Sequence, residues 1–236
     1  MEHENRLCDL SFFQGIREET LRRLWNAGQA RSFPGKHHLI RAKDQVTALY
    51  FQISGKSCVY TLTHHGQRKI HFILGRGELL NQNTLNHSVA ATYVETLEPS
   101  VVFCVPSEDF GRCMREDFDL TRALVGAQER KLWRLEHQMK NTVSGLYMER
   151  KLAAKLWKLA RDFGVKKPEG IEIDVDFSVS FLADMLGTPR ETASRLRNTL
   201  ARYGLISVNR RRITIVDPKR MAHFYKTGEL ESPDGR

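Results

Sequence analysis

Residues 186–196 read LGTPRETASRL and gather side chains that bind other molecules through hydrogen bonds. A helix beginning near Pro189 would carry four of them on its first two turns: Arg190, Glu191, Ser194 and Arg195. A guanidinium donates a fork of hydrogen bonds, a carboxylate accepts them, and a hydroxyl does both. In the major groove of DNA, these groups match guanine O6 and N7, cytosine N4, and the space beside a thymine methyl. The stretch therefore predicts base recognition.

The charge around this stretch favours the same chemistry. The chain has a net charge of +9 and a pI of about 9.5. Residues 177–226 hold ten Lys or Arg residues against three acids, which leaves +7 in about a fifth of the length. Such a concentration indicates an anionic partner, and double-stranded DNA is the partner we expect.

The same residues also have ordinary structural roles. Thr188 is placed to be an N-cap, Pro189 to be the first helical residue, and Glu191 to complete a capping box. Glu191 and Arg195 lie four residues apart and can pair on a helix surface. These roles and base contacts are compatible, so the sequence leaves both open.

The spacing of small and apolar residues around the stretch is that of a helix-turn-helix. Ala183 allows close helix packing, Gly187 suits a turn with positive φ, and Ala193 and Leu196 give the second helix an inner face. LISV and RITIV then bracket NRRR at 209–212, which predicts a wing hairpin. We expect contacts to the DNA backbone from Thr188, Arg197, Arg202, Arg210, Arg211 and Arg212.

The rest of the chain divides by pattern into an α+β protein. Residues 11–30 have a helical pattern, and short β-branched and aromatic stretches over 31–106 predict a β-barrel or roll, so we expect a β-roll domain over 12–106. One long helix is expected over 107–145, and the DNA-binding domain over 146–219. Within that domain we expect helices at 149–164, 179–186 and 189–203, a C-cap at Gly164, a loop at 166–170 and a short strand after it. Residues 229–236 are expected to be disordered.

The long helix has a seven-residue apolar repeat. One seam contains Phe118, Val125, Leu132, Met139 and Leu146, and the second seam contains Thr121, Gln128, Leu135 and Thr142. A modest coiled-coil seam of this kind favours a homodimer. Packing against the chain's own β-domain remains an alternative, and a long helix has enough faces for both.

Together these features resemble the CRP/FNR superfamily of bacterial transcription regulators. The resemblance includes YFQISGK, GRGELL and the motif Glu191-x-x-Ser194-Arg195, which is similar to E-x-x-S-R of the FNR branch. It implies a cyclic-nucleotide-binding-like β-roll (jelly roll), a dimerisation helix, a winged helix-turn-helix and RNA polymerase as a partner. It also implies a palindrome of the type TTGAT–N4–ATCAA, with Arg195 on guanine, Glu191 on cytosine and Ser194 beside a thymine.

The effector is where the sequence departs from that family. Gly77, Glu78 and Leu79 match the cyclic-AMP cassette, but no Arg lies between Arg76 and Arg112 to hold the phosphate. Cyclic AMP is therefore disfavoured, and the effector or redox signal is unidentified. The weak candidates for effector contacts are Glu78, Leu132 and Leu135.

Metal and cofactor sites find little support in the spacing of their ligands. The cysteines are far apart and lack the iron–sulfur pattern: Cys8, Cys58, Cys104 and Cys113. A haem sensor is an alternative, with axial ligands from His64, His65, His71, His87 or Cys58. Adjacent histidines in a strand point to opposite faces, which argues against a metal on His37–His38 or His64–His65.

Other classes of protein fit less well. A cupin-like metalloenzyme with a DNA-binding appendage would need a His-x-His pair, which the chain lacks, and no catalytic Tyr, Ser or acidic cluster stands out. We therefore expect no enzymatic activity. No apolar run approaches a membrane span of about 20 residues, and the first residues are not those of a secretory signal. We expect a cytoplasmic protein without a membrane partner.

Overall fold

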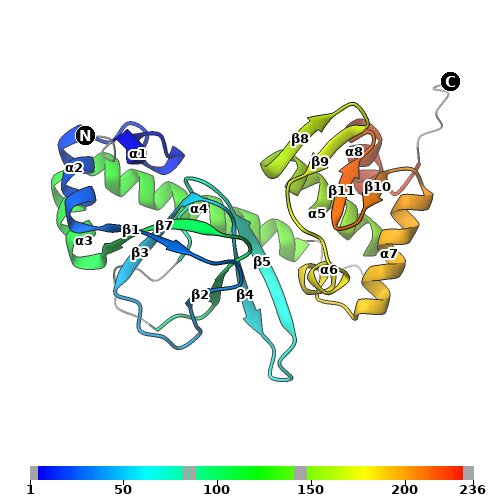
Figure 1. The fold of residues 1–236 in the computed structure, drawn as a ribbon, viewed down its shortest axis with the longest axis horizontal. Coiled ribbons are helices and arrows are strands. Elements are labelled where there is room, and N and C mark those ends of the chain that lie inside the picture. The colour runs from blue at the N-terminus through cyan, green and yellow to red at the C-terminus, as the bar shows by residue number, and fades with distance from the viewer. Residues whose placement is uncertain (1–4, 82–84, 86–88, 141–147, 231–236) are drawn as a thin grey trace. The chain divides into compact units, whose positions relative to one another are not determined.

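The computed structural model describes residues 5–81, 85, 89–140 and 148–230. The chain separates into two compact units, residues 1–137 and 138–236. In the first, strands and helices are mixed along the chain, whereas the second is mainly helical with one small sheet (Figure 1). Each unit is described separately below.

The first unit contains two antiparallel sheets, as the alternation of short strands predicts. One has the order β1-β7-β3 and the other β2-β6-β4-β5. The strands are β1 (Gln29–Phe33), β2 (His38–Ile40), β3 (Ala48–Ser54), β4 (Ser57–Leu62), β5 (Arg68–Leu74), β6 (Tyr93–Thr96) and β7 (Ser100–Pro106). The two sheets enclose a core to which each contributes, with Phe72 and Val94 from one and Val102 from the other.

Helices cover a second core on the three-stranded sheet. They are α1 (Asn5–Cys8), the 3-10 helix η1 (Ser11–Phe13), α2 (Glu18–Ala27) and α3 (Ser107–Glu116). Phe12, Phe13, Phe51 and Phe110 bring their rings together here, and all four are buried. The helix expected within 11–30 is therefore two elements, separated by Gly15 at φ +79°.

The helix expected over 107–145 is divided. α3 ends at Glu116, Asp117 adopts an extended conformation, and α4 runs over Phe118–Lys140. The Asp117 carboxylate accepts a hydrogen bond from the Asp119 amide at 3.1 Å, which caps the start of α4. Residues 141–147, with Thr142 and Leu146 of the expected seams, lie outside the described residues.

Between residues 148 and 230, the second unit contains four helices around a sheet of order β10-β11-β9-β8. Along the chain these are α5 (Met148–Phe163), β8 (Gly164–Lys167), β9 (Gly170–Ile173), α6 (Val179–Leu186), α7 (Arg190–Arg202), β10 (Ile206–Asn209), β11 (Arg212–Ile215) and α8 (Pro218–Thr227). α5 packs against α7 and α8, so the three form one layer of the unit.

Two sequence predictions for this unit were wrong and one element was missed. Gly164 is the first residue of β8 and not a left-handed cap, because β8 follows α5 directly. The expected loop at 166–170 is largely a hairpin, since Lys166 and Lys167 belong to β8. α8 was not predicted, although Asp217 caps it and Pro218 is its first residue. Of the expected tail, only residues 229 and 230 are described.

None of the described helices is both long enough and apolar enough to cross a membrane.

Candidate nucleic-acid interface

The turn between α6 and α7 has the geometry that the helix-turn-helix spacing predicts. Gly187 has φ +68° and ψ 51°, and its amide donates to the Ala183 carbonyl at 2.8 Å. This left-handed conformation suits glycine because a Cβ would crowd the following carbonyl. Ala183, Ala193 and Leu196 are all buried, so α7 packs on α6 through its small and apolar face.

The predicted capping box at the start of α7 is not formed. The N-cap is Pro189, whose carbonyl accepts the first helical hydrogen bond from the Ala193 amide at 3.0 Å. No side chain caps this end, so Thr188 precedes the helix without capping it. The extended conformation of Pro189, with ψ 153°, delays the helix by one residue relative to the prediction.

The polar face of α7 is available to a partner. Arg190, Glu191 and Arg195 are exposed and Ser194 is half-buried, while Ala193, Leu196 and Leu200 form the buried face. In the part of the chain that the structure describes, these four polar side chains have no hydrogen-bond or ion-pair partner. The alternative pairing of Glu191 with Arg195 is therefore absent, and their binding groups are not consumed within the fold.

The six residues predicted to contact the DNA backbone fall into three groups: those on or beside α7, those in the wing turn, and Arg212 in β11. In the first group, Thr188 precedes α7, Arg202 is its last residue, and Arg197 donates to its neighbour Asn198 at 3.3 Å. Arg210 and Arg211 form the two-residue turn between β10 and β11, where Arg210 has φ +54°.

Arg212 differs from the other wing arginines. It lies in β11 instead of the turn, and its guanidinium pairs with Asp174 at 2.7 Å and Asp176 at 3.3 Å. The turn therefore presents two arginines, while the third connects the hairpin to the segment that follows β9.

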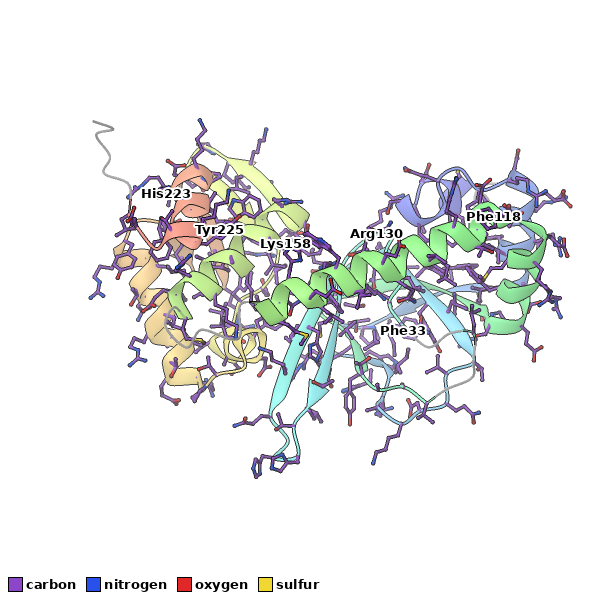
Figure 2. The ribbon with its side chains drawn as sticks, turned by 180° about the vertical axis from the view of Figure 1, so that it is seen from behind. Phe33, Phe118, Arg130, Lys158, His223 and Tyr225 are labelled. Carbon is purple, nitrogen blue, oxygen red and sulfur yellow. The ribbon has the colours of Figure 1, made fainter. Side chains whose placement is uncertain are left out.

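α4 has two apolar faces in the described part. Leu120, Leu124 and Ala127 are buried against the first unit. The described side chains of the first predicted seam are exposed: Phe118 by 76%, Val125 by 51%, Leu132 by 58% and Met139 by 68%. The second predicted seam is not a matching exposed row, because Leu135 packs against the core between the sheets. Figure 2 shows Phe118 near the start of α4 and Arg130 further along, where the helix crosses the strands of the roll.

The three weak effector candidates do not lie together. Glu78 follows β5, and the two leucines are on different faces of α4. Glu78 accepts from the Gly75 amide at 2.8 Å and pairs with Arg134 of α4 at 3.1 Å. Leu135 packs against the core between the sheets, whereas Leu132 belongs to the exposed seam. Inside the roll, a cavity of about 10 Å³ is lined by Asn81 and Val94 among others.

Lys131 and Arg134 were missed by the sequence analysis, although both lie where α4 meets the roll. Lys131 is 6% exposed, and its ammonium donates to the Asn81 carbonyl at 3.3 Å. Burial lowers the pKa of Lys131 to about 8. Their positions in the α4 sequence carry no sign of these partners, which are about 50 residues away in the chain.

The cysteine candidates and His71 are dispersed. The rings of His64 and His65 lie together instead of on opposite faces, with centroids 3.7 Å apart, because both residues are in the turn between β4 and β5 and not in a strand. Cys58 accepts a hydrogen bond from Arg68 at 2.8 Å, and burial raises the pKa of Cys104 to about 11. His71 contacts Thr61, while His87 lies outside the described residues. In the described ranges, no three residues of the His, Cys, Asp and Glu types come close enough together to hold a metal ion.

Comparison with known protein families matches both units. Residues 30–117 match the cyclic nucleotide-binding domain, and residues 150–224 match the Crp-like helix-turn-helix domain. The fold and the arrangement of α6 and α7 thus define the class of protein: a cyclic nucleotide-binding-type domain followed by a helix-turn-helix DNA-binding domain.

Individual relatives point to the same class. The global nitrogen regulator of Synechocystis sp. is 32% identical over 132 residues, which is 56% of each chain. This chain thus spans little more than half of that relative's length. The fumarate and nitrate reduction regulatory protein of Salmonella typhi is 23% identical over 190 residues, covering 78% of this chain and 73% of its own.

A solved structure agrees in fold. FixK2 from Bradyrhizobium japonicum superposes with a TM-score of 0.72 at 18% identity, covering 88% of this chain and 99% of its own. With both domains matched in the order expected, the chain belongs to the CRP/FNR superfamily of transcription regulators.

Proposed function

We propose that this protein is a transcription regulator that binds a palindromic TTGAT–N4–ATCAA-like operator as a homodimer, with α7 in the major groove. The observation that carries the proposal is the polar face of α7. Arginine, glutamate and serine side chains stand on its first turns without a described partner, opposite a fully packed face. A recognition helix needs this combination, because base contacts require side chains that the fold does not already occupy.

Each side chain then has a separate role. Arg195 forks onto guanine O6 and N7, and Glu191 accepts from cytosine N4 on the complementary strand. Ser194 lies one turn from Arg190 on the same helix and is small enough to sit beside a thymine methyl. Arg210 and Arg211 at the wing turn contact phosphates, which fix the register without reading the sequence.

Substitution of Arg195 tests this assignment. With duplexes carrying the operator or a scrambled version, we expect Arg195→Ala to weaken operator binding by about 1–3 kcal/mol, roughly 5- to 150-fold, through loss of a bidentate base contact. Binding to scrambled DNA should weaken much less. Fluorescence anisotropy at several salt concentrations measures both affinities.

Arg202→Ala is the matched control, because it removes the same group from the other end of α7. It should weaken binding to both duplexes equally and reduce the salt slope by about 0.9. An equal loss of both affinities in Arg195→Ala would contradict a base-reading role for Arg195.

The exposed seam of α4 supports the dimer. Its apolar residues recur every seventh position and face away from the buried residues of the same helix. A second copy of α4 packed in parallel would cover this seam and relate two α7 helices by a two-fold axis. The palindrome requires the same symmetry, with half-sites about 34 Å apart.

We infer that the controlling signal is not cyclic AMP. The carboxylate of Glu78, the residue that matches the family's ribose contact, is already paired with Arg134. The stretch that should hold the phosphate has no arginine between Arg76 and Arg112. Titration calorimetry with cyclic AMP should detect no saturable binding, and a stoichiometric isotherm would contradict this inference.

We also propose that the operator-bound dimer acts on RNA polymerase, as membership of a family of transcription regulators suggests. Transcription in vitro from a promoter that carries the operator should change when the protein is added. No change on any placement of the operator would contradict a direct effect.

A further inference from the structure

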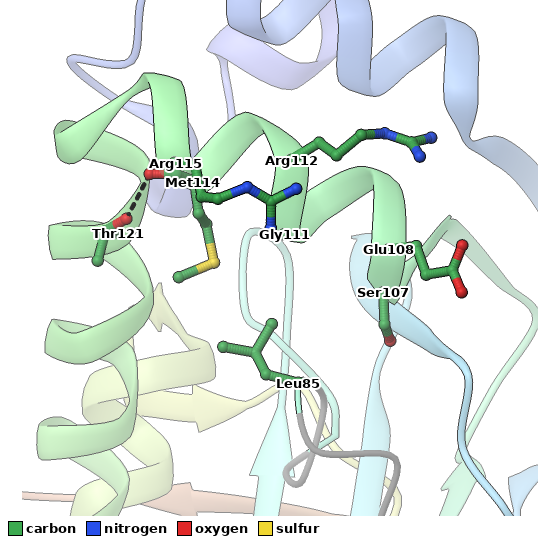
Figure 3. Close-up of a pocket in the computed structure, with 8 residues that line it drawn as sticks. All are labelled: Leu85, Ser107, Glu108, Gly111, Arg112, Met114, Arg115 and Thr121. Carbon is green, nitrogen blue, oxygen red and sulfur yellow. Dashed lines mark hydrogen bonds between the residues drawn. The ribbon is translucent and has the colours of Figure 1, made fainter.

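A cleft of about 560 Å³ lies beside α3 in the first unit, and its described lining includes neither Glu78 nor Arg134. It is formed mainly by Ser107, Gly111, Met114 and Arg115 of α3, with Thr121 of α4 and Leu85 at its edges (Figure 3). Its volume is within the range of small-molecule sites. The two polar groups considered below for recognition, Ser107 and Arg115, both lie on α3.

Ser107 gives the first sign of a ligand. Its side chain is 4% exposed, and its hydroxyl oxygen has no hydrogen-bond partner among the described residues. Its backbone amide, by contrast, is bonded to the Thr47 carbonyl at 2.9 Å. A buried hydroxyl without a partner is costly in a native protein, and a bound polar group would remove that cost.

Arg115 supplies a positive charge at the same cleft. It is exposed and has no ion-pair partner in the described ranges, because the adjacent Glu116 is engaged by Arg23. Figure 3 shows the Arg115 guanidinium between Met114 and Gly111, over the space that faces Leu85. The other charged lining residues, Arg112 and Glu108, extend away from that space.

The middle and the corner of the cleft are shaped by two further residues. A Cβ placed on Gly111 would meet nothing within 4 Å, so this helical glycine leaves open space beside Arg115. Thr121 donates to the Met114 carbonyl at 2.9 Å, which fixes the corner between α3 and α4. The wall is therefore defined by the fold, and the Ser107 side chain, whose oxygen is buried, must rotate to meet a ligand in the cleft.

We propose that this cleft binds a small organic carboxylate with a hydrocarbon portion. Arg115 forks onto the carboxylate, and the Ser107 hydroxyl donates to one of its oxygens. Met114 and Leu85 contact the hydrocarbon. The proposal is independent of the operator and of the dimer, since it uses only residues of the first unit.

Octanoate is the probe, with octanol as the uncharged compound of the same length. Titration calorimetry on the full chain should give one octanoate site with a Kd of about 1 mM or tighter. Octanol should bind much more weakly. Absence of saturable octanoate binding, or equal binding of octanol, overturns the proposal.

Variants locate the site. Arg115→Gln should weaken octanoate binding about 10-fold or more, since a charge-assisted hydrogen-bond pair is lost. Arg122→Gln is the matched control, because Arg122 is 73% exposed on α4 and does not line the cleft, and it should leave the affinity unchanged. Unchanged affinity in Arg115→Gln places octanoate elsewhere and overturns the assignment.

Filling the cleft separates binding from folding. Gly111→Leu puts a side chain into the open space and should abolish octanoate binding, while Tm stays the same or rises because leucine favours helix over glycine. Ser107→Ala should weaken binding severalfold without lowering Tm, because no described group loses a partner. A folded Gly111→Leu variant that binds octanoate normally contradicts the site.

Discussion

Lys131 lies on the face of α4 that meets the roll, and replacing it with methionine should stabilise the protein. Its ammonium has three hydrogen atoms to donate, but the Asn81 carbonyl at 3.3 Å is its one hydrogen-bond acceptor among the described residues. The nearest carboxylate, Glu78, is already engaged by Arg134. Methionine has a similar length and no charge to desolvate, so burying it in the same space costs less free energy.

The size of the effect follows from the pKa of Lys131. Desolvation by burial, which outweighs the attraction of Glu78, lowers this pKa from its ordinary 10.5 to about 8. Each pKa unit corresponds to about 1.4 kcal/mol, so the buried ammonium costs at most about 3 kcal/mol at neutral pH. Lys131→Met should therefore raise the free energy of unfolding at pH 7 by about 1–3 kcal/mol, allowing for imperfect packing of the new side chain.

The direction of the pH dependence provides an independent check. Below pH 8 the lysine is charged in both the folded and the unfolded chain, and the full cost is present. Between 8 and 10.5 the unfolded chain binds more protons than the folded chain, so stability rises with pH. The stability gained by Lys131→Met over the wild type should therefore be largest at neutral pH and shrink as the pH rises through this range.

Urea unfolding followed by circular dichroism, at fixed protein concentration and at pH 7 and 9.5, measures both effects. Arg130→Met is the matched control, because Arg130 is exposed one position earlier on α4, and it should change stability by less than about 0.5 kcal/mol. A Lys131→Met variant that is less stable than the wild type at pH 7, or whose advantage over the wild type is the same at pH 7 and 9.5, would refute the reasoning.

Four further substitutions test other parts of the molecule. Leu132→Glu places like charges in the exposed seam and should yield a monomer in analytical ultracentrifugation; a stable dimer contradicts the α4 interface. Gly187→Ala should cost about 1 kcal/mol in urea unfolding because of its positive φ, whereas Gly111→Ala should stabilise by a similar amount. The pKa of Asp117 is lowered overall, because burial raises it but hydrogen bonds from Thr20 and Arg17 lower it by more. The Asp117 carboxylate therefore stabilises the folded chain, and this stabilisation is lost as the pH falls through the lowered pKa. Asp117→Asn should therefore flatten the acid side of the stability profile, and an unchanged acid slope argues against this role.

The sequence was most informative where neighbours along the chain decide the structure. Alternating β-branched residues predicted the strands of both sheets, and Ala183, Gly187, Ala193 and Leu196 predicted the helix-turn-helix, which is confirmed by its geometry and burial. These signals work because helical and extended periodicities bring a side chain to the same face at fixed intervals.

Local signals failed where two of them competed. Thr188 and Pro189 form a favourable helix start, but the left-handed Gly187 and the extended Pro189 delay the helix to Arg190. The repeat from Phe118 to Met139 lies on one exposed side of α4, but beginning the predicted helix at residue 107 ignored Asp117 as a cap. Pairings such as Arg134 with Glu78 depend on the folded roll, so no local pattern could predict them.

The cost of Lys131 bears on how this protein is controlled. A buried cation that destabilises the fold is expected to persist where it serves a purpose other than stability. On the same helix, Leu132 belongs to the seam that we propose pairs with a second copy. A ligand that binds beside Lys131 and Arg134, or a charge that changes there, thus acts within one helical turn of the proposed dimer contact. If α4 transmits the signal, Lys131→Met should weaken the response to that signal while leaving the intrinsic contact of α7 with the operator intact.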